Sequence, residues 1–470
     1  MAQKLRKYYL DTEENREYLR ELGDELLAFG QRFPSPGGSS WYLGDDGTPW
    51  KDRPRETWIT SRMTHVYSIG TMLAANGGAA KTGSAANGGA AETGSAADAG
   101  AAKTGSAADA GAAKTGSAAD AGEKERFAAL ADAGLKGLRG ELRDKENGGW
   151  YAGLAPDGTP LPTKQCYAHA FVILAACSAY LAGRPGAEEL LKDALADFDR
   201  YFWDEKESLT RDTWDTEFRN CDDYRGLNAN MHTVEAFLAV ADTLKDEKYR
   251  VRAGKIITRV LGWAAANGWR IPEHFSKDWQ PDLNCNADKK DYQFKPYGAT
   301  PGHGIEWSRL ITQWAFSTFR KEGETGIPEK AAPFLRGAEQ LFRRAIGDAW
   351  NADGAPGIVY TTDWEGTPVV HDRMHWTLAE AINAAAVLFR VTGDHYYSIM
   401  YAEFMAYLDQ CVHDPVNGSW FHQMDRENRP IGTVWPGKSD LYHAFQATKI
   451  PYLDPAVSIA AAVHAAEKQD

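Results

Sequence analysis

The sequence contains few cysteines, and none of them belongs to a recognisable motif. The five cysteines lie at positions 166, 177, 221, 285 and 411, an odd number without a Cys-x-x-Cys pair. A disulfide framework and a zinc ribbon both need paired cysteines, so both are disfavoured. We therefore expect free thiols and a reducing compartment.

Long apolar runs are also missing. No stretch reaches the roughly 18 consecutive apolar residues that a membrane-spanning helix needs. The first residues, MAQKLRKYYLDTEE, lack the apolar core of a signal peptide. The sequence thus predicts a cytoplasmic protein without a membrane partner.

An excess of positive charge is absent too, and so are the common cofactor motifs. The net charge is −13, which disfavours nucleic-acid binding because a binder must neutralise phosphates. The sequence contains no GxxxxGK[ST] motif and no GxGxxG followed by an acidic residue, so no nucleotide cofactor is predicted. It also lacks HExxH and any Cys-His cluster with ligand spacing, and we predict neither a metal nor another cofactor.

One segment, residues 75–122, differs from the rest in composition. The word Gly-Ser-Ala-Ala recurs there every 11 residues, starting at Gly83, Gly94, Gly105 and Gly116. Each glycine costs a helix about 1 kcal/mol relative to alanine. The repeat contains no large apolar residue to offset the loss of chain entropy. We expect a disordered insert, because a helix lying on a lipid surface would need an apolar face.

The remaining chain shows apolar residues at helical spacing. Twelve helices are predicted, separated by turn-rich loops, some with a short β-hairpin such as residues 357–362. The expected spans are 13–31, 57–74, 124–142, 166–182, 186–203, 228–244, 247–266, 303–321, 330–348, 374–392, 395–412 and 440–467. Consecutive helical hairpins favour an all-α (α/α)6 barrel, a single catalytic domain over residues 1–470 with the even-numbered helices inside.

Three segments place a histidine at or near the start of an inner helix. They are NANMH at 228–232, TPGHGIEW at 300–307 and DLYH at 440–443. Histidine takes and gives a proton near neutrality because its ordinary pKa is about 6.5. Each histidine alone also fits a satisfied core residue or a helix start. Three equivalent positions indicate one shared pocket.

These segments carry a family resemblance. NANMHTVEAFL, ATPGHGIEWSRL, DGAPGIVYTTDWEGTPVV, NGSW and GKSDLYH occur in that order. Together they resemble the N-acylglucosamine 2-epimerase superfamily, most closely its mannose isomerase and sulfoquinovose isomerase branch. The similarity runs from about Trp58 to about Asp454. It implies the same barrel and catalysis without a metal.

The resemblance also implies roles for individual residues. His443 is expected to move a carbon proton, and His303, tuned by Glu306 three residues later, is expected to open the sugar ring. His232 and Arg62 are expected to position the open chain. The further candidates for substrate binding are Asn230, Glu380, Trp376, Trp364 and His422. His169 is a weaker candidate, and most of the other histidines are expected in loops or on the surface.

The implied reaction is an aldose–ketose isomerisation through a cis-enediol. We expect conversion between D-mannose and D-fructose, with D-lyxose and D-xylulose as a second pair, in a monomer or homo-oligomer. Sulfoquinovose isomerisation and 2-epimerisation stay open, because bases on two faces of C2 would epimerise the sugar. An (α/α)6 glycosidase using paired carboxylates and a pure binding protein are the other classes.

Overall fold

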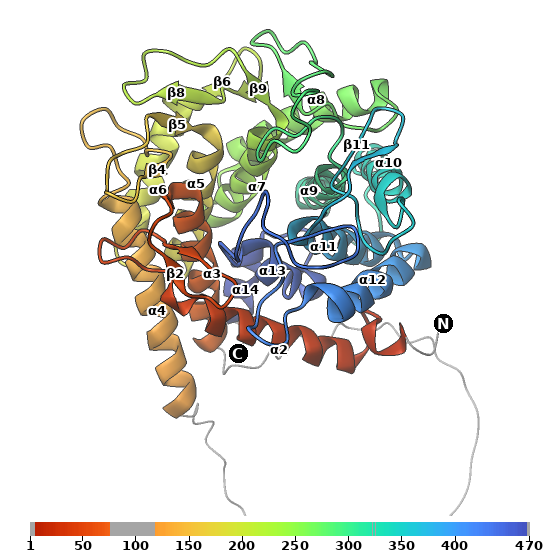
Figure 1. Ribbon diagram of the computed structural model, residues 1–470, viewed down its shortest axis with the longest axis horizontal. Helices are drawn as coiled ribbons and strands as arrows, with labels where there is room; N and C mark the ends of the chain where they lie inside the picture. The colour runs from red at the N-terminus through yellow and green to blue at the C-terminus, as the bar shows by residue number, and fades with distance from the viewer. Residues whose placement is uncertain (1–4, 76–117, 322, 325, 468–470) are drawn as a thin grey trace, which may run out of the picture.

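The helices form two concentric rings (Figure 1), in a computed structural model that describes residues 5–75, 118–321, 323–324 and 326–467. The inner helices are α3 (Thr57–Ala75), α5 (Cys166–Leu181), α7 (Leu227–Leu244), α9 (Pro301–Phe319), α11 (His375–Thr392) and α13 (Tyr442–Ala447). Each contacts the next, and α13 contacts α3, which closes the ring.

The outer helices cover this ring from outside. They are α2 (Glu13–Phe29), α4 (Ala118–Arg139), α6 (Ala187–Asp197), α8 (Glu247–Ala266), α10 (Ala332–Ala349) and α12 (His395–Tyr407). Helices α4, α6, α8, α10 and α12 each contact the inner helix next to them in sequence, and α2 contacts α3 and α13. The predicted (α/α)6 barrel, with the even-numbered predicted helices inside, is confirmed.

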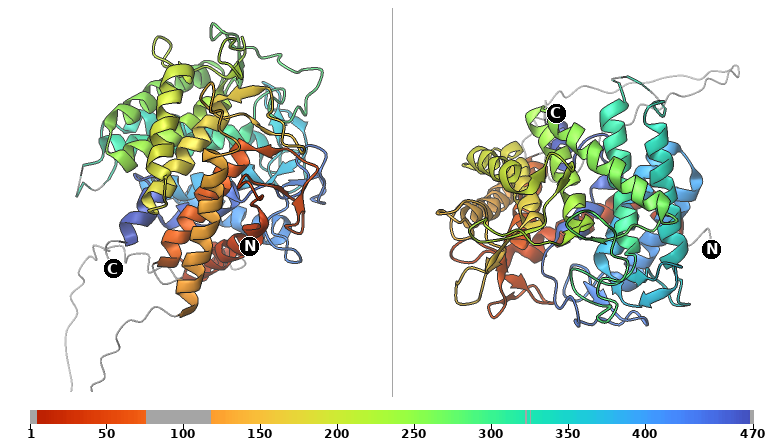
Figure 2. Two further views of the ribbon diagram at one scale, coloured as in Figure 1. Left: turned by 90° about the vertical axis from the view of Figure 1, so that its left-hand side faces the viewer. Right: turned by 90° about the horizontal axis from the view of Figure 1, so that it is seen from above.

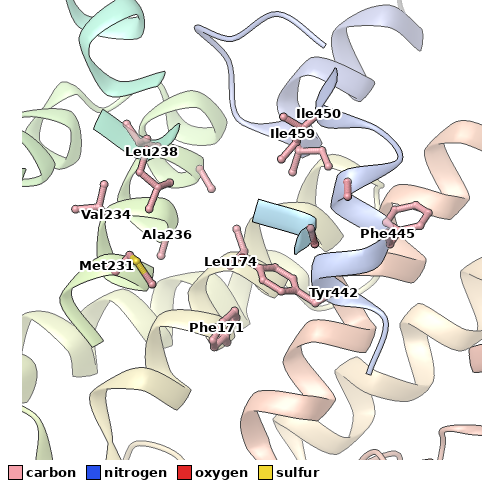
Figure 3. Close-up of a cluster of buried hydrophobic side chains, with 14 of the residues drawn as sticks. Phe171, Leu174, Met231, Val234, Ala236, Leu238, Tyr442, Phe445, Ile450 and Ile459 are labelled. Atoms are coloured by element: carbon pink, nitrogen blue, oxygen red, sulfur yellow. The ribbon is translucent and has the colours of Figure 1, made fainter. Parts of the chain in front are cut away.

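The two rings differ because their sequences differ. Helix α5 is apolar on nearly every side and almost wholly buried, as expected of a helix enclosed by others. Helix α8 alternates charged and apolar residues and buries one face. Figure 3 shows how α5, α7, α13 and the segment after α13 meet in the core, where side chains such as Phe171, Leu238 and Phe445 gather. Burying one such side chain contributes about 1.5–3 kcal/mol.

Short helical pieces complete the chain. They are η1 (Arg6–Tyr8), η2 (Gly30–Arg32), η3 (Phe198–Phe202), η4 (Leu408–Val412), η5 (Ile450–Tyr452) and α14 (Ile459–Glu467). The last predicted helix, 440–467, is wrong as one element. It divides into α13, η5 and α14, since Pro451 and Pro455 each lack the backbone N–H that a continuous helix needs.

The described strands form seven two-stranded antiparallel pairs. They are β1 (Tyr42–Leu43) with β2 (Pro49–Trp50), β3 (Arg55–Glu56) with β4 (Gly153–Leu154), β5 (Thr163–Gln165) with β8 (Thr213–Asp215), β6 (Trp203–Asp204) with β7 (Leu209–Thr210), β9 (Arg225–Gly226) with β10 (His274–Phe275), β11 (Thr361–Thr362) with β12 (Pro368–Val370), and β13 (Arg373–Met374) with β14 (Gln423–Met424). Of the predicted β-like run at 357–362, only the last two residues form a strand, which pairs with β12 as a hairpin.

The strands mark one end of the barrel. Strands β3, β5, β9 and β13 run directly into inner helices α3, α5, α7 and α11, so the N-terminal ends of these helices lie at the hairpin end. Figure 2 shows the barrel from the side, with hairpins and long loops gathered at one end. Side chains at the starts of the inner helices therefore share one space.

Two sequence predictions concern segments at the edges of this description. Residues 76–117 of the predicted insert lie outside the described residues, whereas residues 118–122 begin α4 and are helical, contrary to prediction. Among the helices of the described chain, none is both long enough and apolar enough to cross a membrane.

Candidate active site

A cavity of about 620 Å³ lies at the hairpin end of the barrel. All six inner helices contribute to its lining, through residues at their starts or just before them, and the loops between them contribute further polar and aromatic side chains. The lining residues are Trp58, Arg62, Tyr167, Asn228, His232, Gln293, Phe294, Pro296, His303, Glu306, Tyr360, His375, Trp376, His422, Trp435, Ser439, Asp440 and His443. The three histidines singled out in the sequence thus share one pocket.

His443 is held in one defined tautomer. Its Nδ1 lies 3.0 Å from Oε1 of Glu380, and its Nε2 lies 3.4 Å from an Nη of Arg62. A guanidinium only donates hydrogen bonds, so Nε2 must accept and Nδ1–H must donate to Glu380. Burial and the charge of Arg62 lower the pKa of His443 well below its ordinary value. His443 is therefore neutral at pH 7, with the basic lone pair on Nε2.

Arg62 is fixed by partners around the cavity. It donates to Oδ2 of Asp440 at 3.3 Å and to the hydroxyl of Tyr167 at 2.9 Å. Burial would raise the pKa of Asp440, but Arg62 and the backbone N–H of Tyr442 outweigh it and lower that pKa. The guanidinium therefore lies beside the basic nitrogen of His443 as a fixed positive charge.

His232 stands beside two buried carboxyl groups. Its Nδ1 lies 3.5 Å from Glu235 and 3.9 Å from Glu306, and burial lowers the pKa of His232 to about 4. Burial and the charge of Glu380 raise the pKa of Glu306 well above its ordinary value. Within the described chain neither carboxyl oxygen of Glu306 has a hydrogen-bond partner. The carboxyl group of Glu306 is therefore harder to ionise than usual, and it faces the cavity.

His303 does not pair with Glu306, which corrects the predicted pair. Its Nδ1 lies 3.1 Å from Oε1 of Glu273, a residue just before β10. Glu306 instead lies 3.5 Å from Arg309 on the same helix. His303 is also more accessible than His443: its side chain is 13% exposed, and that of His443 is 6% exposed.

Aromatic rings form much of the remaining wall. The ring of Trp376 lies 5.0 Å from that of His303 and 5.9 Å from that of His443, so it lies between the two. A side chain on Gly302 would meet the Trp376 ring at 2.7 Å, which explains the glycine before His303. His422 stacks on His375 with ring centres 3.7 Å apart.

Three predicted substrate-binding residues do not line the cavity. Asn230 accepts from the backbone N–H of Thr210 and donates to the carbonyl of Gly226, whereas its neighbour Asn228 lines the pocket. The Trp364 indole donates to the carbonyl of Leu283 and so ties two loops together.

Glu380 and His169 also lie away from the wall of the cavity. Glu380 is fully buried behind His443 and supports it. His169 accepts from the backbone N–H of Trp150, so this weaker candidate is a satisfied core histidine. Arg62, Trp376 and His422 do line the cavity as expected.

Sequence reasoning missed several residues of the site. His375 was expected in a loop or on the surface, and it is buried against His422. Glu235 and Arg309 follow His232 and Glu306 at the same three-residue spacing that singled out His303 and Glu306, so spacing could have indicated both. Glu273 carried no such signal, because a loop brings it to His303.

Two described groups have metal-ligand geometry. They are His232, Glu235 and Glu306, and Glu306, Glu380 and His443, with ligand atoms within 4.8 Å of one another in each group. Arg309 lies against the same carboxyl groups, at 2.7 Å from Glu380 and 3.5 Å from Glu306. A divalent cation would therefore meet a guanidinium that already neutralises its ligands.

The arrangement suits proton transfer on a small polar molecule. Neutral His443 supplies a base, Arg62 supplies a positive charge beside it, and Glu306 supplies a carboxyl group whose raised pKa favours the proton-donating form. Such groups abstract a proton next to a carbonyl and stabilise the oxyanion that forms.

Comparisons with known proteins point to one family. Residues 116–447 match the family model of N-acylglucosamine 2-epimerase. A D-mannose isomerase of Thermobifida fusca is 37% identical over 452 residues, which cover 96% of this chain and 97% of that protein. A D-mannose isomerase of Pseudomonas cannabina pv. alisalensis is 42% identical over 337 residues, 72% of this chain and 80% of that one. A solved structure of D-mannose isomerase superposes with a TM-score of 0.75 at 23% identity, covering 93% of this chain and 97% of the other.

Proposed function

The chain belongs to the N-acylglucosamine 2-epimerase family, and we propose that it is an aldose–ketose isomerase that interconverts D-mannose and D-fructose. The observation that carries this proposal is the hydrogen-bonded set Glu380–His443–Arg62, which presents one buried base beside one fixed positive charge. The Thermobifida fusca relative named D-mannose isomerase aligns with 96% of this chain, which supports the same activity here.

The carbon chemistry follows from this set. His443 Nε2 removes the proton from C2 of the open-chain aldose and returns it to C1, while the proton of the C2 hydroxyl passes to the C1 oxygen, so that C2 becomes the carbonyl carbon. The electron pair left at C2 forms the enediolate, and Arg62 lies where it can stabilise the negative oxygen. Because a single base serves both carbons from the same face, the product is a ketose and not a C2 epimer.

Ring opening precedes this step and uses His303. Its side chain is more exposed than that of His443, and its Nδ1 lies 3.1 Å from Oε1 of Glu273. His303 takes the proton of the anomeric hydroxyl and gives it to the ring oxygen as the C1–O bond of the ring breaks. Glu306 and His232 hold the hydroxyl groups of the open chain.

The charge of the cavity favours a neutral sugar over sulfoquinovose. Of the described residues that line it, the one lysine or arginine is Arg62. Arg62 is already paired with Asp440 at 3.3 Å. A sulfonate would find no spare cation there, and burying an unpaired anion is costly.

Metal independence and a cytoplasmic location are further parts of the proposal. Metal independence is supported by Arg309, which lies beside the candidate metal ligands. A cytoplasmic location is supported by the five cysteines, all of which are free thiols in the structure. Activity is expected to survive exhaustive dialysis against EDTA. A loss that only a divalent cation restores would overturn the first.

A panel of free sugars followed by ¹H NMR tests the activity. We expect D-mannose to yield D-fructose, with D-lyxose as a slower substrate. D-glucose formed from D-mannose without fructose would identify an epimerase instead. Conversion of sulfoquinovose alone would overturn the substrate assignment, and release of sugar from a glycoside would indicate a glycosidase.

A further inference from the structure

Arg309 occupies the centre of a buried carboxylate cluster beneath the active site. It is 2% exposed and lies on α9, one turn after Glu306. Its Nε donates to Oε2 of Glu380 at 2.7 Å. One Nη lies 3.5 Å from Glu306 and 4.0 Å from Glu235, and the other donates to Gln313 at 3.0 Å. One cation thus faces three carboxyl groups.

Arg309 does not line the cavity that holds the sugar, so it acts through another residue. The shortest path runs through the two oxygens of Glu380. Oε2 accepts from Arg309, and Oε1 accepts from Nδ1 of His443. Glu380 at Nδ1 and Arg62 at Nε2 together set which nitrogen of His443 carries a proton, and the ionised state of Glu380 is the acceptor half of that arrangement.

We propose that Arg309 is a positioning residue that keeps Glu380 ionised and thereby keeps the basic lone pair of His443 on Nε2. This inference rests on the proposed isomerase function. With Arg309 present, ionised Glu380 accepts from Nδ1–H. Without it, a protonated Glu380 donates to Nδ1, and the proton of the neutral imidazole moves to Nε2, which faces the substrate. That tautomer is not a base for C2.

The electrostatics of the cluster support this direction. Burial raises the pKa of Glu380, and the charge and hydrogen bond of Arg309 act against the rise. The charged and titratable groups that surround Glu380 come from three other helices: Arg309 and Glu306 of α9, His232 and Glu235 of α7, and His443 of α13. The negative charge of the Glu235 carboxylate opposes ionisation of Glu380.

A second cavity makes Arg309 open to chemical replacement. A space of about 440 Å³ lies on the side of the cluster away from the sugar pocket. Arg309, Glu235, Gln446, Leu174, Ile450 and Ser458 are among the residues that line it. Cutting back Arg309 therefore leaves a void continuous with this cavity. Free guanidinium fits that void and the charge that surrounds it.

The test compares Arg309→Ala, Arg309→Lys and Gln313→Ala with the wild type, using D-mannose turnover from pH 5.5 to 9.5. In Arg309→Ala we expect turnover at pH 7 to fall at least about tenfold. The acid limb of kcat should move upward by about 1–3 pH units, the range that loss of one neighbouring opposite charge causes. Arg309→Lys should shift it less, and Gln313→Ala, which keeps the charge, should keep the wild-type limb.

Chemical rescue supplies a second readout. Guanidinium chloride at tens of millimolar should restore part of the activity of Arg309→Ala at pH 7, whereas urea should not. A loss of activity in Arg309→Ala that is equal at every pH and insensitive to guanidinium would overturn the proposal and indicate a merely structural arginine. A wild-type profile in that variant would overturn it too. If the wild type itself fails to isomerise D-mannose, the proposed function fails instead.

Discussion

The two histidines flanking Trp376 have different surroundings. His443 lies at the start of α13 and is held on both nitrogens, by Glu380 and by Arg62. His303 lies at the start of α9, has one carboxylate neighbour in Glu273 and reaches solvent more readily. The carbon proton needs a base with one fixed tautomer in a dry site. Ring opening needs a group that exchanges protons with oxygen atoms and with water.

This difference shows how one residue type serves two tasks in one pocket. His443 has low solvent exposure and two fixed hydrogen-bond partners, whereas His303 is more accessible to solvent. The same contrast separates the carboxyl groups, because Glu380 is locked between two partners and Glu306 faces the cavity without one in the described chain. Environment, and not residue identity, assigns the roles.

The largest expected effect comes from removing either histidine. His443→Ala should lower turnover of D-mannose by about 10²–10⁴-fold, the usual contribution of a general base. His303→Ala should be similarly damaging with D-mannose, because a closed ring offers no acidic C2–H. Since the two steps act on one substrate in sequence, the double variant should lose far less than the product of both effects. Circular dichroism checks that each variant is folded. Near-normal turnover in His443→Ala would contradict the assignment of the carbon proton transfer to His443.

A smaller effect should separate Glu273 from Glu306 as the partner of His303. Glu273→Gln removes the charge beside His303 Nδ1 and should cost about 1.5–3 kcal/mol, roughly tenfold to a hundredfold in turnover. The loss should concern ring opening. A substrate analogue that is permanently open-chain, with an aldehyde at C1, should therefore react almost normally in this variant. An equal loss with the open-chain compound would show that Glu273 serves the carbon chemistry.

The buried histidines predict a moderate dependence of stability on pH. Burial lowers the pKa of His65 to about 4, and that of His375 likewise to about 4. A folded pKa below the unfolded value of about 6.5 means that the unfolded chain binds protons first. The contribution of these two neutral histidines to the free energy of unfolding is complete above pH 6.5 and is lost as the pH falls toward 4. The urea midpoint should decline over this window, and His65→Asn should make the decline shallower. A midpoint that rises on acidification would contradict the burial of these rings.

The smallest expected effect concerns the Gly/Ala/Ser repeat. Its composition offers no apolar face, and the candidate site is built without it. Deleting residues 76–117 and joining the ends with a short linker should leave helical content, melting temperature and turnover within about a few-fold of wild type. A collapse of the melting temperature would show that the repeat supports the barrel.

The ring of helices could be read from the sequence because apolar periodicity reports burial directly. Helix α5 is apolar on nearly every side, so its sequence alone indicates an inner helix. The division of the last helix was not predicted, although Pro451 and Pro455 mark it. Apolar periodicity continues across both prolines and therefore favours a single helix, although both backbone N–H groups are missing.

The site was predictable where its residues share a helix and unpredictable where loops bring them together. Family motifs located His303 and His443, and the structure places both in one cavity. The three-residue spacing predicts Glu306 as the partner of His303. The carboxyl group beside His303 instead belongs to Glu273, 30 positions earlier in the chain. Asn230 and Trp364 were chosen for residue type. Their hydrogen bonds to backbone atoms show that the fold uses them instead.

One experiment addresses the single buried base most directly: conversion of D-mannose in D₂O, with the deuterium content of C1 of D-fructose measured by NMR at early times. A shielded His443 returns part of the proton that it takes from C2, so the C1 position should carry less than one deuterium per turnover. The His443→Ala variant should form no labelled fructose at a comparable rate. Complete deuteration at C1 from the first turnover, or exchange at C2 with accumulation of D-glucose, would contradict a single shielded base.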